Sequence, residues 1–213
     1  MKAALISGGS LDEVFTSEFL MEWKPDQIIG VDKGLLFLYQ HQIQPDLIVG
    51  DFDSLPEAVL EQYQDLVPIR RFLPEKDAAD TEIGIREAMN MGADQIVLLG
   101  ATGTRLDHVL ANIQVLMIPL KEGITAFIQD QHNRIRLLEH GMVIEKEQMF
   151  GDYVSFFPLT WEVTNLTLKG FQYPLQQHTL TSNNSLTVSN EVIAGQAVVE
   201  FEDGILIMIE SRD

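Results

Sequence analysis

Short apolar runs alternate with segments of helical spacing through the first 130 residues of the chain. The runs are rich in Ile, Val and Leu and lie at 3–7, 27–31, 46–49 and 95–99. Gly, Asp or Ser clusters follow them, and apolar residues then recur three or four positions apart at 55–63, 83–91 and 106–117. Apolar strands separated by amphipathic helices are typical of a helix-covered parallel sheet. The sequence therefore predicts an α/β N-terminal domain with a mostly parallel sheet flanked by helices.

The pattern changes at about residue 131, where short strand-like segments follow one another with no long helical segment between them. Strands are expected at 154–157, 162–168, 196–202 and 205–210. Asp203-Gly204 is the expected turn between the last two. This pattern favours a smaller all-β, sandwich-like C-terminal domain. We expect the two domains to span 1–130 and 131–213.

The composition excludes several classes of protein. The 213 residues include 14 Lys+Arg and 32 Asp+Glu, which gives a formal charge of −18. Such an acidic chain is unsuited to nucleic acid or to an anionic membrane, because both ligands require a basic surface. The absence of cysteine rules out disulfides and thiolate zinc sites. No apolar stretch is long enough for a signal peptide or a membrane span, so a cytoplasmic location is expected.

Asp51 and Asp53 directly follow the expected strand at 46–49. In extended backbone, residues i and i+2 project to the same side, so both carboxylates would face one ligand. Magnesium is commonly held by one or two carboxylates together with substrate phosphates. Asp is also a frequent helix N-cap, and a helix is expected to begin near residue 55. The motif therefore fits either a metal site or a helix cap.

A second acidic segment, 74–82, precedes the expected helix at 83–91. Carboxylates in a first helical turn are favoured by the helix dipole, which accounts for Asp80 and Glu82 without any function. The dipole does not account for Lys76 beside Asp77. A lysine among carboxylates at a strand-to-helix crossing would suit a polyanionic ligand.

A third segment, 100–108, also lies between an expected strand and an expected helix. Its glycines allow backbone amides to approach phosphates, and the helix N-terminus favours an anion. Arg105 offers a planar fork for phosphate, while Asp107 could hold Arg105 or bind a ribose hydroxyl. His108, among apolar neighbours, fits packing better than catalysis. Together the three segments predict a magnesium-dependent enzyme that acts on a phosphorylated small molecule or a nucleotide.

Six motifs occur in a characteristic order along the chain. They lie at 31–34, 45–54, 75–82, 100–108 (followed by Asn112), 170–175 and 189–191. With these motifs the chain resembles the bacterial thiamine pyrophosphokinase (thiamine diphosphokinase) family over essentially its whole length. The resemblance implies transfer of a pyrophosphoryl group from ATP to the hydroxyl of thiamine, giving thiamine diphosphate and AMP. It also implies a homodimer with the active site at the subunit interface.

The resemblance assigns roles to three sets of residues. Magnesium ligation is implied for Asp51, Asp53 and Asp80, with Asp77 close by. ATP contacts are implied for Asp32, Ser54, Thr102, Gly103, Arg105 and Asp107, and thiamine contacts for Lys76, Ser189 and Asn190. Catalysis is thus expected to involve Asp51, Asp53, Asp77, Asp80 and Arg105, with Asp77 or Asp80 the candidate if a base is needed. The N-terminal domain would bind ATP and magnesium, and the C-terminal domain thiamine.

The chain departs from the family pattern at three positions. Lys33 stands where the family usually has Gly, Ala79 replaces a Thr and removes a hydroxyl, and Thr104 precedes Arg105. Two alternative functions follow from the same residues. One is a magnesium-dependent nucleotide phosphohydrolase that uses the same carboxylates, and the other is a non-catalytic thiamine or nucleotide sensor, which only Ala79 favours.

Overall fold

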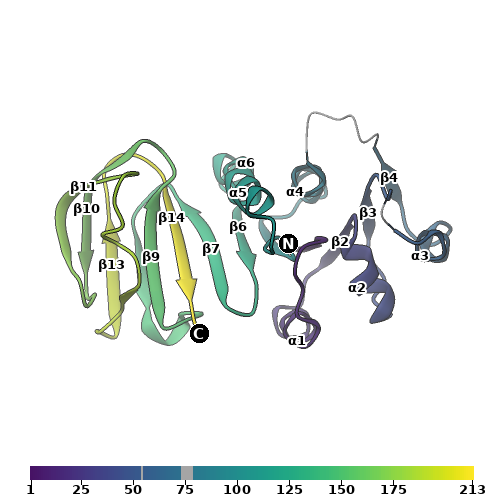
Figure 1. Cartoon of the computed structure of the whole chain (residues 1–213), viewed down its shortest axis with the longest axis horizontal. Coiled ribbons are helices and arrows are strands. Elements are labelled where there is room, and N and C mark those ends of the chain that lie inside the picture. Colours follow the sequence, from purple (N-terminus) through teal and green to yellow (C-terminus); the bar gives the residue numbers. More distant parts are fainter. Residues whose placement is uncertain (54, 73–78) are drawn as a thin grey trace. The chain divides into compact units, whose positions relative to one another are not determined.

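A computed structural model describes residues 1–53, 55–72 and 79–213 of the chain, which divides into two units, Met1–Gln131 and His132–Asp213 (Figure 1). Strands and helices alternate in the first unit. In chain order it contains β1 (Lys2–Ile6), α1 (Glu13–Trp23), β2 (Gln27–Val31), α2 (Gly34–Gln40), β3 (Leu47–Gly50), α3 (Glu57–Tyr63), β4 (Ile69–Arg71), α4 (Asp80–Asn90), β5 (Gln95–Leu99), α5 (Leu106–Val115), α6 (Met117–Lys121) and β6 (Thr125–Gln129).

The strands of the first unit pair in the order β6-β5-β1-β2-β3-β4, and every one of these pairs is parallel. The α/β prediction is therefore confirmed. Strands β1, β2, β3 and β5 form where apolar runs predicted them. β4 was not predicted, because two of its three residues are Arg70 and Arg71. Helix α3 begins at Glu57 rather than residue 55, and Pro56 is its N-cap.

The strand order determines where a ligand can bind in this unit. β1 lies between β2 and β5, so the chain builds the sheet outward on one side of β1 and then returns to the other side. In open α/β sheets, ligands bind beyond the carboxyl ends of the strands at such a switch point. Most residues of the central strands are buried, and Leu5, Ile29 and Leu98 are fully so.

The second unit contains only strands and one short 3-10 turn. Its strands are β7 (Asn133–Leu138), β8 (Met142–Glu145), β9 (Tyr153–Pro158), β10 (Glu162–Lys169), β11 (Leu175–Thr181), β12 (Asn190–Glu191), β13 (Gln196–Glu200) and β14 (Leu206–Ser211). One antiparallel set has the order β12-β9-β14-β7, and the other β11-β10-β13-β8. Both sets bury residues in one core, including Phe156 and Met208 from the first and Leu166 and Val199 from the second. The all-β, sandwich-like prediction is confirmed.

Asp203 and Gly204 do not form the tip of a hairpin. β13 pairs with β10 and β8, whereas β14 pairs with β7 and β9. The turn therefore carries the chain from one strand set to the other. Residues of β13 and β14 meet through their side chains in the core and not through a hydrogen-bonded ladder.

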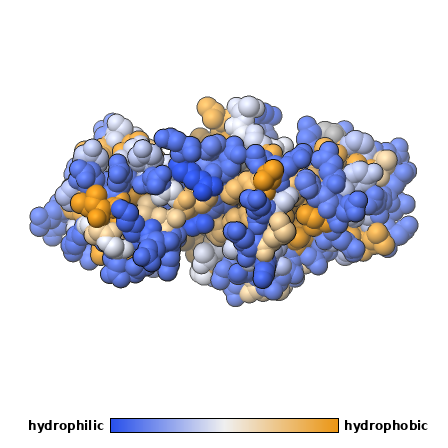
Figure 2. Space-filling model, turned by 90° about the horizontal axis from the view of Figure 1, so that it is seen from below, coloured by the Kyte–Doolittle hydropathy of each residue, from blue (hydrophilic) through white to orange (hydrophobic). Residues whose placement is uncertain are grey.

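Polar residues cover much of the surface. Figure 2 shows a face on which hydrophilic residues predominate and hydrophobic areas are separate from one another. Within the described ranges, no helix is long and apolar enough to cross a membrane.

Glu210, in the interior strand β14 of its set, is expected to stabilise the second unit. Its side chain is 1% exposed, accepts a hydrogen bond from Arg136 at 3.1 Å and accepts another from the Phe150 N–H at 3.1 Å. Removing one partner of a buried ion pair leaves the other charge uncompensated. Glu210→Ala should lower the free energy of unfolding by about 3 kcal/mol, measured by urea denaturation.

Glu200→Ala is the matched control for this prediction. Glu200 pairs with Lys169 at 2.8 Å, but both side chains are more than half exposed. Exposed pairs contribute about 0–1 kcal/mol. Equal destabilisation by the two variants would contradict the role given to burial at Glu210.

Candidate functional site

A cavity of about 540 Å³ lies where β1, β2 and β5 end. Its wall comes from the loops that follow these strands and from the starts of α4 and α5. The lining residues are Ser7, Gly8, Gly9, Ser10, Val31, Asp32, Lys33, Ala79, Asp80, Thr81, residues 100–105, His108, Val109, Ala111 and Asn112. The volume is in the range of small-molecule sites, and the position is the switch point of the sheet.

Backbone contacts join two of the loops that line this cavity. The Gly9 N–H donates to the Gly100 carbonyl at 2.8 Å, and the Ser10 N–H donates to the Thr102 carbonyl at 2.8 Å. A Cβ atom on Gly9 would lie 2.2 Å from the Thr102 oxygen, so no larger residue fits there. The two loops thus form a wall of backbone at the carboxyl ends of β1 and β5.

Arg105 and Asp107 form a two-point ion pair beside the cavity. Nε of Arg105 donates to Asp107 Oδ1 at 3.2 Å, and Nη2 donates to Oδ2 at 2.6 Å. This pairing raises the pKa of Arg105 and lowers the pKa of Asp107. Both side chains remain well exposed. The sequence allowed Asp107 either to hold Arg105 or to bind a ribose hydroxyl. In the structure, Asp107 orients the Arg105 guanidinium.

Asn112 fixes the loop that carries Arg105. The Asn112 side chain is buried, and its Nδ2 donates to the Ala101 carbonyl at 2.8 Å. One turn earlier on α5, His108 is exposed and lines the cavity. The packing role expected for His108 is therefore wrong, because α5 turns this side chain toward the cavity and away from the core.

Three carboxylates concentrate negative charge near the end of β2. Burial raises the pKa of Asp32, the charge of Asp80 raises it further, and Asp51 adds to the same effect. The backbone N–H and the charge of Lys33 lower this pKa, but not enough to offset burial and the two neighbouring carboxylates. A divalent cation or a positively charged ligand group would relieve this repulsion.

Two polar atoms at the cavity have no hydrogen-bond partner within the described part of the chain. They are the Ser7 hydroxyl oxygen and Asp32 Oδ1, and both are buried. Buried polar atoms are nearly always hydrogen-bonded in native proteins. A polar ligand that enters the cavity would supply the missing partners.

Asp51 and Asp53 lie on a loop that differs from the extended backbone expected from sequence. Phe52 between them has a φ of 65°, and the Asp53 N–H donates to Asp51 Oδ1 at 3.1 Å. Helix α3 has no side-chain hydrogen bond at its N-cap, so neither aspartate caps it in the described structure. Residues 1–53, 55–72 and 79–213 contain no ready-made group of three or more His, Asp or Glu side chains that could hold a metal.

Ser189 and Asn190 lie in the second unit. The exposed Ser189 has a φ of 53°, and its N–H donates to Ser155 Oγ at 2.9 Å. Asn190 is 2% exposed; its Nδ2 donates to the Tyr173 carbonyl at 2.8 Å, and its Oδ1 accepts from the Tyr173 N–H at 3.0 Å. Asn190 thus holds the backbone at Tyr173 with both ends of its amide.

The cavity brings together some of the site residues predicted from sequence. Asp32, Asp80, Thr102, Gly103 and Arg105 line it, whereas Asp51, Asp53 and Asp107 are not among the lining residues. Ser54, Lys76 and Asp77 lie outside the described residues.

The sequence reasoning missed the loop from Ser7 to Ser10, which supplies four of the lining residues. Gly8-Gly9 directly after an apolar run is the same signal that identified the segment at Gly100. The signal was therefore available in the first ten residues of the chain.

Asp32→Asn is expected to raise the melting temperature of the ligand-free protein at neutral pH. The raised pKa of Asp32 means that its ionised form is disfavoured in the fold. This cost is present above the raised pKa, and it disappears below the usual Asp pKa of 3.8, where folded and unfolded states both hold the proton. Asn also tolerates the φ of 47° at this position.

Thermal melts from pH 4 to pH 8 test this prediction. The stabilisation by Asp32→Asn should grow as the pH rises through the raised pKa. Asp65→Asn, at an exposed carboxylate, serves as the control and should leave the melting temperature unchanged. A variant at Asp32 that is less stable than the parent at pH 8 would contradict the repulsion among the three carboxylates.

Two family models match the chain in the order of the two units. "Thiamin pyrophosphokinase, catalytic domain" matches residues 20–128, and "Thiamin pyrophosphokinase, vitamin B1 binding domain" matches residues 139–206. Thiamine pyrophosphokinase of Bacillus subtilis (strain 168) is 37% identical over 187 residues, which is 87% of each chain.

Solved structures give the same result. The crystal structure of thiamine pyrophosphokinase from Bacillus subtilis superposes with a TM-score of 0.88 at 32% identity, covering 100% of both chains. That of thiamin pyrophosphokinase from Geobacillus thermodenitrificans superposes with a TM-score of 0.83 at 31% identity, covering 100% of this chain and 98% of the other. On sequence and structure together, the chain belongs to the thiamine pyrophosphokinase family.

Proposed function

We propose that this chain binds ATP in the cavity at the ends of β1, β2 and β5 and transfers its pyrophosphoryl group to the hydroxyl of thiamine. The products are thiamine diphosphate and AMP. The observation that carries the proposal is the cavity itself, which has a backbone wall, an oriented guanidinium and two buried polar atoms without protein partners. These features suit a polar, phosphorylated ligand.

Several residues of the first unit have distinct proposed roles in ATP binding. Thr102 and Gly103 belong to the loop that offers backbone to the phosphates, and Arg105 presents its guanidinium to them. Asp107 keeps this guanidinium in one orientation through two hydrogen bonds. Asp32 Oδ1 and the Ser7 hydroxyl would accept or share hydrogen bonds with hydroxyl groups of the nucleotide. Ser54 and Lys76 remain predicted contacts to ATP and thiamine.

The charge at the site fits a divalent cation. Burial and the charges of Asp80 and Asp51 raise the pKa of Asp32. Oxygen donors of this kind suit Mg²⁺. We assign Asp51, Asp53 and Asp80 as its ligands. When bound, Mg²⁺ supplies positive charge that offsets the charge of the phosphates.

In the reaction itself, the thiamine hydroxyl oxygen forms a bond to the β-phosphorus of ATP. The bond from this phosphorus to the oxygen bridging the α- and β-phosphates breaks, and AMP leaves with that oxygen. The hydroxyl proton passes to a carboxylate, for which Asp77 and Asp80 are the candidates. Transfers of this kind depend on positioning and electrostatics, so no nucleophilic side chain is required.

Thiamine recognition is proposed for the second unit. Ser189 offers an exposed hydroxyl. The neighbouring Asn190 is held in place by its two hydrogen bonds to the backbone of Tyr173. We further propose a homodimer in the cytoplasm, with the active site at the interface between its subunits.

Product analysis tests the proposal and separates it from its alternatives. The protein is incubated with ATP and Mg²⁺, with and without thiamine, and nucleotides and thiamine esters are separated by chromatography. AMP and thiamine diphosphate in equal amounts, formed only when thiamine is present, are the expected result. Phosphate release without thiamine would indicate a phosphohydrolase, and tight ligand binding without any product would indicate a sensor.

A further inference from the structure

We infer that Phe52 is a positioning residue that holds Asp51 and Asp53 in place through the burial of its ring. The inference rests on the proposed function, in which these two aspartates bind the metal. Phe52 itself takes no part in metal binding or in the proposed reaction.

The backbone at Phe52 is strained. Its φ of 65° lies in the left-handed region, which is unusual for a bulky residue. Strained conformations persist only where the surrounding structure holds them, and they gather at functional sites. Asp51 and Asp53 flank the strained residue directly, so its conformation determines the directions in which both carboxylates leave the chain.

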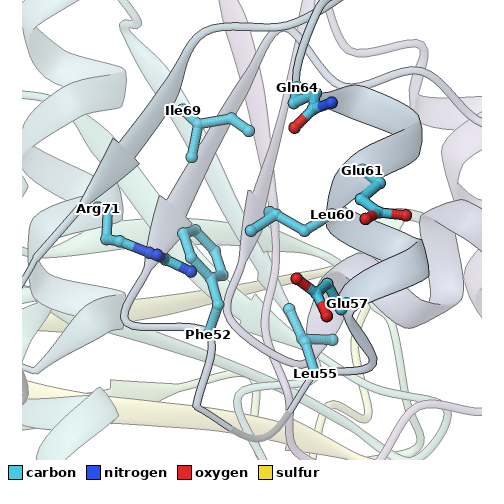
Figure 3. A pocket seen from close by; sticks show the side chains of 8 residues that line it. All are labelled: Phe52, Leu55, Glu57, Leu60, Glu61, Gln64, Ile69 and Arg71. Carbon is cyan, nitrogen blue, oxygen red and sulfur yellow. The ribbon is translucent and has the colours of Figure 1, made fainter.

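Burial of the Phe52 ring stabilises this conformation. The residue is 5% exposed, although Asp53 beside it is exposed and Asp51 is only partly buried. Figure 3 shows its ring at the wall of a second cavity between α3 and β4. Leu55, Leu60 and Ile69 line the same cavity, and burial of apolar surface against them favours the strained backbone.

The end of β3 and the edge strand β4 support the ring from its other sides. The Arg71 guanidinium lies over the ring at 5.6 Å from its centre, an attractive cation–π arrangement. A Cβ atom on Gly50 would come within 3.0 Å of the ring and 3.2 Å of Asp32 Cα, so the ring packs tightly beside the strand end. The Leu55 N–H donates to the Phe52 carbonyl at 3.2 Å and closes the turn.

These contacts make the carboxylates pre-organised. A smaller apolar side chain at position 52 would keep the backbone strain while losing part of the burial that offsets it. The loop would then sample relaxed conformations in which the two carboxylates point elsewhere. Removing a group that orients metal ligands typically weakens metal binding or activity by about ten- to a hundredfold.

The test measures Mn²⁺ binding by EPR on the full chain with a non-hydrolysable ATP analogue, alongside kcat for AMP formation. Mn²⁺ takes the oxygen ligands that suit Mg²⁺. Phe52→Leu should weaken Mn²⁺ binding about tenfold or more. Arg71→Gln removes an exposed side chain, so it should fold normally and weaken binding by a smaller factor. Leu116→Ala opens the core of the first unit at a buried residue that lines neither cavity, so it should lower the melting temperature with Mn²⁺ affinity unchanged.

Asp51→Asn distinguishes failure of the metal assignment from failure of the positioning role. If the parent binds Mn²⁺ and Asp51→Asn weakens that binding, the metal assignment stands. Phe52→Leu with parental affinity would then overturn the positioning role alone, as would an equal loss of affinity in Leu116→Ala. If the parent does not bind Mn²⁺, or Asp51→Asn binds it as the parent does, the metal assignment fails and the positioning role fails with it.

Discussion

Replacing Asp51 with Asn is expected to reduce kcat for thiamine diphosphate formation by about a thousandfold. The substitution keeps the size of the side chain and its ability to accept the hydrogen bond from the Asp53 N–H, but it removes the negative charge. Metal ions contribute several kcal/mol to the stabilisation of charge in such transfers, and about 4 kcal/mol corresponds to a factor of a thousand in rate. The melting temperature of the ligand-free protein should not fall, because the lost charge repels Asp32.

Initial rates at saturating ATP, thiamine and Mg²⁺, combined with thermal melts, measure both effects. Glu57→Gln is the matched control, since Glu57 is an exposed carboxylate at the start of α3 and belongs to none of the proposed ligand sets. It should retain parental kcat. A folded Asp51→Asn variant with parental kcat would overturn the metal assignment.

Gly34→Ala is expected to destabilise the first unit by about 3 kcal/mol, which corresponds to a fall of about 6–12 °C in melting temperature. Gly34 begins α2 and is buried. A Cβ atom there would lie 1.8 Å from the Ile6 carbonyl oxygen and 2.8 Å from the Ser7 nitrogen. These are backbone atoms at the end of the central strand β1, which cannot move aside, so α2 itself must shift.

Gly195→Ala is the control for this substitution. A Cβ atom at Gly195 would have no heavy atom within 4 Å. Its effect on the free energy of unfolding should stay within about 1 kcal/mol.

Because Ser7 and Lys33 adjoin the Gly34 contact and line the cavity, Gly34→Ala should also raise the KM for ATP. A Gly34→Ala variant as stable as the parent would contradict the close approach of α2 to β1.

The fold was largely predictable because its signals are local. Buried parallel strands such as β2 and β5 need continuous apolar residues, and Gln27–Val31 and Gln95–Leu99 show them plainly. β4 carries only Ile69 as an apolar residue among its three, so hydrophobic periodicity could not reveal it. The Asp203-Gly204 turn was recognised correctly, but pairing partners depend on contacts distant in sequence, which a turn signal does not carry.

The candidate site was predictable in its residue types and less so in its geometry. The Gly-rich segment after the strand at 95–99 identified Arg105, and the family resemblance implied Asp32 and Asp80; all three line one cavity. The conformation of Phe52 could not be foreseen, because a positive φ at a bulky residue depends on tertiary packing around its ring. The raised pKa of Asp32 likewise arises from burial and from carboxylates that only the fold brings near.

The position of β14 has a consequence for how the chain acquires its structure. β14 follows the other described strands in the sequence, yet it lies between β7 and β9 and pairs with both. Until residues 206–211 are available, those two strands lack their common neighbour and Phe156 lacks its cover from Met208. The first unit can assemble from successive strand–helix–strand pieces during translation. The second must wait for its final segment, so we expect it to fold later and more slowly, with an aggregation-prone intermediate in between.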